Sequence, residues 1–151
     1  MLAARGLSNI LSNPKLQHVL SEFENQEKII CSATALFPTG HQNLEISLAS
    51  LLYNVSVQQI QKPNLEGSVL VASSIATQVL PSLTQDEAIY RSLLALGNII
   101  VTGPAEVKEF LQSMEIGGLV KEYTKKEEKI SSCSTEILKF LEPTSDGLDL
   151  D

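Results

Sequence analysis

A short phrase, Leu-x-Asn-[Ile/Val], recurs at a nearly constant interval along the chain. Its asparagines are Asn9, Asn54 and Asn98, so the intervals are 45 and 44 residues. A further step of that length reaches Phe140 and Leu141, where the asparagine is missing. A period of about 40–47 residues in a helical chain is typical of armadillo and HEAT repeats, which stack into a solenoid. The spacing therefore predicts an all-α armadillo/HEAT-like helical solenoid of about three to four repeats.

Apolar periodicity and breaks at proline and glycine divide the chain into helices. The main predicted helices cover residues 26–37, 41–61, 65–80, 84–102, 105–113, 118–124 and 127–141. The longest of these, 41–61, is apolar nearly all round, as expected of a helix that packs between neighbours. Thr84-x-x-Glu87 has the spacing of a capping box and predicts the start of the fourth helix in that series.

The chain is predicted to hold one folded unit and a short tail. Residues 1–142 carry the solenoid pattern, whereas residues 143–151 are acidic, lack a partner pattern and are predicted to be disordered. Residue 2 already lies in a helical pattern with no capping residue before it. We therefore expect this chain to be the C-terminal part of a longer repeat domain that is truncated on its N-terminal side.

Charge and cysteine content narrow the function classes. The net charge is −7, which argues against nucleic acid as a partner because phosphates need a clustered cationic face. No apolar run reaches the roughly 20 residues of a membrane span, and no secretory signal is present. Cys31 and Cys133 form no CxxC pair and are expected to be reduced thiols. A monomeric cytoplasmic or nuclear protein without a cofactor is expected.

Two arginines and the recurring asparagines suggest a binding surface. Arg5 precedes Asn9 by four residues and Arg91 precedes Asn98 by seven, so each arginine shares a helix face with its asparagine. An asparagine amide can both donate to and accept from an extended peptide backbone. Arginine binds carboxylates bidentately, which lysine does not. The predicted peptide-binding groove consists of Arg5, Asn9, Ser47, Ser50, Asn54, Arg91 and Asn98, where the two serines leave its middle open.

Other interpretations remain open. Each asparagine could instead bond a neighbouring helix, because buried amides are usually satisfied internally, and the arginines could form ordinary surface ion pairs. The groove could also hold an amphipathic helix of another partner, as in a general helical-repeat scaffold. Catalysis by Cys31 with His41, or by Cys133 with His18, lacks an orienting carboxylate or a nucleophile elbow. The two His and two Cys lack metal-ligand spacing. Residues 121–129, rich in Lys and Glu, are interpreted as a solvated surface.

The order and spacing of several segments resemble the PUL domain. This domain ends the phospholipase-activating protein PLAA and its fungal ubiquitin-pathway counterparts, and it occurs fused to thioredoxin-like or deSUMOylase-type domains. The resemblance runs from residue 1 to about 142. The segments that carry it are residues 1–9, 43–57, 64–67 and 86–98.

The resemblance implies an armadillo-like solenoid without enzymatic activity. It further implies that a basic groove binds the C-terminal tail of the valosin-containing AAA ATPase, as a cofactor of that ATPase in ubiquitin-dependent protein handling. Ubiquitin itself would be bound through domains that this chain lacks. Arg5 and Arg91 match the groove arginines of the family, and Asn9 and Asn54 match polar positions of the same helices. Asn98 stands where relatives often have Thr.

Overall fold

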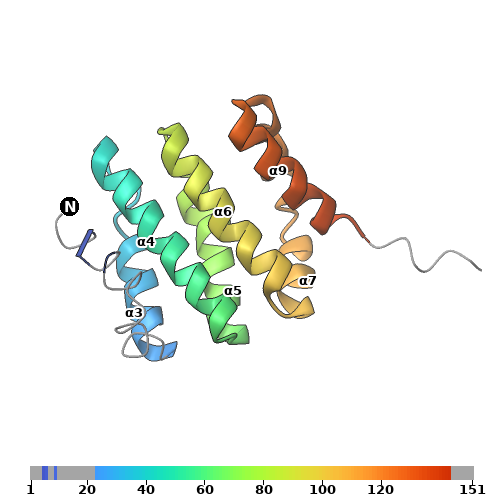
Figure 1. Cartoon of the computed structure of the whole chain (residues 1–151), viewed down its shortest axis with the longest axis horizontal. Helices are drawn as coiled ribbons and strands as arrows, with labels where there is room; N and C mark the ends of the chain where they lie inside the picture. The colour runs from blue at the N-terminus through green and yellow to red at the C-terminus, as the bar shows by residue number, and fades with distance from the viewer. Residues whose placement is uncertain (1–4, 7–8, 10–22, 144–151) are drawn as a thin grey trace, which may run out of the picture.

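The computed structural model describes residues 5, 6, 9 and 23–143 and shows two layers of helices stacked side by side (Figure 1). One layer contains α4 (Gln42–Gln61), α6 (Asp86–Thr102) and α9 (Glu128–Leu141). The other contains α3 (Phe23–Thr34), α5 (Leu65–Ser74) and α7 (Ala105–Ser113), and α8 (Gly117–Glu122) leads from α7 back to α9. The predicted all-α helical-repeat solenoid is confirmed. Residues 144–151 of the predicted tail lie outside the described residues, as does most of the chain before residue 23.

The core lies between the two layers. Leu52 and Val55 of α4 and Leu96 of α6 are fully buried there, in one apolar cluster with Val71 of α5 and with Ile75, which directly follows α5. Small residues on α5, among them Gly67 and Ala72, are buried and let the helices approach closely. Helix α4 is buried on most of its circumference because it packs against helices on several sides, as its apolar pattern predicts. No helix among those described is long and apolar enough to cross a membrane.

The predicted helix 65–80 changes form before its end. The α-helical part stops at Ser74 and continues as one wide π-type turn, Ile75–Val79, and a 3-10 turn, Leu80–Ser82. Pro81 has no backbone N–H and cannot continue the ladder of an α-helix. The beginning of this helix follows the expected chemistry, because the Asn64 side chain accepts a hydrogen bond from the backbone N–H of Gly67 at 2.8 Å.

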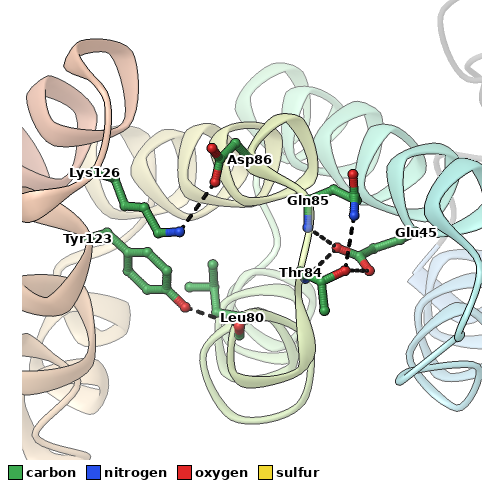
Figure 2. A network of polar contacts seen from close by, with 7 residues as sticks. All are labelled: Glu45, Leu80, Thr84, Gln85, Asp86, Tyr123 and Lys126. Carbon is green, nitrogen blue, oxygen red and sulfur yellow. Dashed lines mark hydrogen bonds and ion pairs between the residues drawn. The ribbon is translucent and has the colours of Figure 1, made fainter.

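The predicted capping box at the start of α6 is wrong. Its N-cap residue is Gln85, and no side chain of α6 itself caps the helix. Instead Glu45 of α4 accepts hydrogen bonds from the backbone N–H groups of Thr84 and Gln85, at 2.7 and 2.8 Å, and from the Thr84 hydroxyl at 3.0 Å (Figure 2). The helix end is therefore capped by a buried carboxylate from its neighbour. This contact fixes the position of α6 against α4.

Candidate functional site

The accessible face of α4 and α6 contains two adjoining hollows, of about 300 and 460 Å³. They share Asn9, Ser50 and Arg91, so they form one continuous depression, which we call the groove. Its lining residues are Arg5, Asn9, Asn43, Ile46, Ser47, Ser50, Tyr53, Asn54, Glu87, Tyr90, Arg91 and Leu94. These volumes lie at the lower end of the range of about 300–1,000 Å³ for small-molecule pockets.

Helix periodicity explains why these residues meet. On α4 the lining residues Ile46, Ser50 and Tyr53 follow one another at intervals of four and three residues and are partly exposed. Positions between them, such as Leu52, point into the core. On α6 the same spacing brings Glu87, Tyr90, Arg91 and Leu94 to the accessible face.

Arg91 lies where the two hollows meet and is held in place by neighbours on both helices. Its Nε donates to Oε1 of Glu87 at 2.8 Å, one turn earlier on α6. Its Nη1 donates to the hydroxyl of Ser50 on α4. The side chain is 38% exposed, so it can reach a ligand without leaving these positions entirely. The arginine therefore points across the groove from α6 toward α4.

The two predicted serines keep the groove open and polar. Ser47 Oγ donates to the carbonyl of Asn43 and Ser50 Oγ donates to the carbonyl of Ile46, each at 2.8 Å. Because each hydroxyl hydrogen is used within α4, the oxygen is left as an acceptor, and Arg91 uses that of Ser50. Short side chains here leave the space between Arg5 and Arg91 free of bulk.

Six of the seven predicted groove residues are brought together by the fold. One hollow is lined by Arg5, Asn9, Ser47, Ser50 and Arg91. The other hollow is lined by Asn54, together with Asn9, Ser50 and Arg91 of the first. Asn98 lines neither hollow. Its Nδ2 donates to Ser56 Oγ of α4 at 3.3 Å, so this amide bonds a neighbouring helix, which is the alternative interpretation of the asparagines. That any of the seven contacts a peptide remains a prediction.

Three residues around Arg91 were not assigned to the groove from the sequence, namely Glu87, Tyr90 and Lys129. Glu87 and Tyr90 lie four and one residues before Arg91 on the same face of α6, a spacing that could have revealed them. Lys129 comes from α9, and its Nζ lies 4.7 Å from the centre of the Tyr90 ring and 4.0 Å from Glu87 Oε2. Its side chain is 59% exposed, in agreement with a solvated surface, but nothing in the sequence places it beside Tyr90.

The groove offers binding groups rather than reactive ones. Its cations and amides can hold carboxylates and peptide backbone. Neither Cys31 nor Cys133 lines it, and burial raises the pKa of the Cys133 thiol, which disfavours the nucleophilic thiolate. His18 lies outside the described residues. Within the described part of the chain, no group of three His, Cys, Asp or Glu residues is placed to hold a metal ion.

The stacked helices and the groove on one face are the architecture of helical-repeat proteins, a class whose extended surfaces serve as binding surfaces. The model of the PUL domain matches residues 1–136, and the chain therefore belongs to the PUL domain family. The chain is also 34% identical over 102 residues to the ubiquitin homeostasis protein lub1 of Schizosaccharomyces pombe. That match covers 66% of this chain and 13% of lub1, so the chain corresponds to a small part of that relative.

Proposed function

We propose that the groove binds the acidic C-terminal tail of the valosin-containing AAA ATPase in an extended conformation. The chain would thereby act as a non-enzymatic cofactor of that ATPase in ubiquitin-dependent protein handling. The observation that carries this proposal is the meeting of both arginines of the chain, Arg5 and Arg91, at one hollow. Membership of the PUL family supports it, as does the name of the relative lub1, a ubiquitin homeostasis protein.

The chemistry of the groove suits such a tail. Every C-terminal tail ends in a carboxylate, and an arginine can hold a carboxylate with two parallel hydrogen bonds. Asn9 and Asn54 supply amides beside the arginines, where they can bond the backbone of an extended peptide without selecting side chains. The two hollows are small and open to solvent, which favours a peptide over a small-molecule ligand.

A titration of the ATPase tail peptide against wild type, Arg5→Ala and Arg91→Ala tests the proposal. A charge-assisted hydrogen bond at a partly exposed site contributes about 1–2 kcal/mol, so each variant should weaken binding about five- to thirtyfold. Arg91→Lys should restore part of the loss, because it keeps the charge without the fork. The wild-type affinity should fall with rising salt more steeply than that of the alanine variants.

Lys139→Ala is the matched control. Lys139 also carries one positive charge, pairs with Glu136 on α9 and lines neither hollow of the groove. It should bind the peptide within about twofold of wild type, because an exposed charge outside the groove contributes little. Equal binding by wild type and both arginine variants would contradict the proposal. Tight binding of an amphipathic helical peptide, without binding of the tail peptide, would favour the alternative of a general helical-repeat scaffold.

A further inference from the structure

Glu87 lies between two cations at the groove. Its Oε1 accepts from Arg91 Nε at 2.8 Å, and its Oε2 lies 4.0 Å from Lys129 Nζ. All three side chains are partly exposed, at 42% for Glu87, 38% for Arg91 and 59% for Lys129. The carboxylate is thus shared between the groove arginine on its own helix and a lysine from the next helix of the layer.

Two local effects stabilise a negative charge at Glu87, independently of any ligand. It lies in the first turn of α6, where the helix dipole favours an anion. It is also four residues before Arg91, the orientation in which an acidic and a basic residue attract most on a helix. The ion pair therefore forms in the absence of any ligand.

This ion pair occupies one of the two edges of the Arg91 guanidinium that can hold a carboxylate with two hydrogen bonds. An incoming carboxylate binds best to two neighbouring N–H groups of the guanidinium at once. Glu87 already takes the Nε hydrogen and Ser50 takes one from Nη1. A ligand must displace Glu87 to gain the side-on fork that includes Nε.

We propose that Glu87 is an internal competitor for the acidic ligand at Arg91 and that Lys129 receives its carboxylate when the ligand binds. Lys129 is suited to this because the Tyr90 ring, 4.7 Å away, holds its ammonium beside Glu87. The groove would then select ligands that form a strong bidentate contact over weakly bound anions. This inference rests on the proposed function of the same groove.

The test is a titration of the ATPase tail peptide against Glu87→Gln, with Asp86→Asn as the matched control. Asp86 is the preceding residue in the same first turn, and it pairs with Lys126 at 3.3 Å rather than with Arg91 (Figure 2). Both variants remove one negative charge, so the general electrostatic gain should be similar. Because partly exposed ion pairs are weak, Glu87→Gln should bind about two- to fivefold more tightly than Asp86→Asn. Equal affinities of the two variants would overturn the inference.

Lys129→Gln tests the transfer of the carboxylate. In the wild-type background it should weaken binding about two- to threefold, because displaced Glu87 has lost its second partner. In the Glu87→Gln background the same substitution should have little effect. An equal loss in both backgrounds would mean that Lys129 contacts the peptide itself, and would overturn the transfer.

The outcomes also separate this inference from the proposed function. If Arg91→Ala weakens the tail peptide while Glu87→Gln matches Asp86→Asn, the groove stands and the internal competitor is excluded. If neither wild type nor Glu87→Gln binds the peptide, both proposals fail. Thermal unfolding of each variant shows whether it is folded, and substitutions at these exposed positions should leave the midpoint almost unchanged.

Discussion

The contact between Glu45 and the start of α6 allows a quantitative prediction. Glu45 is 4% exposed, and its carboxylate accepts three hydrogen bonds from Thr84 and Gln85. Glu45→Ala removes the acceptor for two backbone N–H groups at a helix end, where a missing cap costs about 0.5–2 kcal/mol. The bonds to a charged acceptor and the lost packing add to this, so we expect a loss of about 2–4 kcal/mol in the free energy of unfolding.

Chemical denaturation followed by circular dichroism measures this loss. For a chain of this size about 1 kcal/mol corresponds to roughly 2–4 °C, so the thermal midpoint should fall by about 4–16 °C. Glu45→Gln should lose less, because its amide oxygen can still accept both backbone N–H groups and the Thr84 hydroxyl can rotate to accept from its NH₂ group.

Glu66→Ala is the control for this experiment. Glu66 also lies in the first turn of a helix, α5, but its side chain is exposed. Among the described residues it accepts no hydrogen bond from the start of a neighbouring helix. Its loss should cost no more than about 0.5 kcal/mol. If Glu45→Ala matched Glu66→Ala in stability, the inter-helix cap would contribute nothing measurable, and the argument that it fixes α6 against α4 would be refuted.

Two further predictions concern packing and the thiols. A Cβ at Gly67 would lie 2.6 Å from Gln59 Nε2, whereas a Cβ at Gly97 would meet only Ile137, at 3.5 Å. Gly67→Ala should therefore lower the free energy of unfolding by about 1–3 kcal/mol, whereas Gly97→Ala should leave it unchanged or raise it by up to about 1 kcal/mol. Chemical denaturation of both variants measures these changes. Equal effects of the two substitutions would show that the buried Gln59 amide moves aside without cost. Cys31 is exposed, whereas burial raises the pKa of the Cys133 thiol. A maleimide at pH 7.5 should therefore label Cys31 before Cys133. Mass spectrometry of partly labelled protein measures the order, and equally fast labelling of Cys133 would contradict the prediction.

Much of the fold follows from local patterns in the sequence. The predicted helix 105–113 matches α7, and the predicted helix 41–61 differs from α4 by one residue, because prolines, glycines and apolar periodicity act locally. The start of α6 could not be predicted in the same way. Its cap is Glu45, 39 residues before Thr84, and only the packing of α4 against α6 brings the two together.

Part of the candidate site likewise follows from local sequence patterns, and part of it depends on how the helices pack. The helix faces of Arg91 and Ser50 follow from residue spacing, and the repeat period indicates that α4 and α6 lie side by side. Asn98 illustrates what spacing cannot decide, since a residue on the predicted face can still bond a neighbouring helix, here through Ser56. The position of Lys129 beside the groove could not be predicted from the sequence, because it depends on how α9 packs near Tyr90 of α6.

The central claim is that the face formed by α4 and α6 binds the tail peptide. Backbone amide chemical shifts of the ¹⁵N-labelled chain, recorded during addition of the ATPase tail peptide, test it directly. The account predicts that the largest changes occur at groove residues such as Ser50, Asn54 and Arg91, with little change on α7 in the other layer. Saturable changes centred on α5 or α7, with the groove unaffected, would contradict the account.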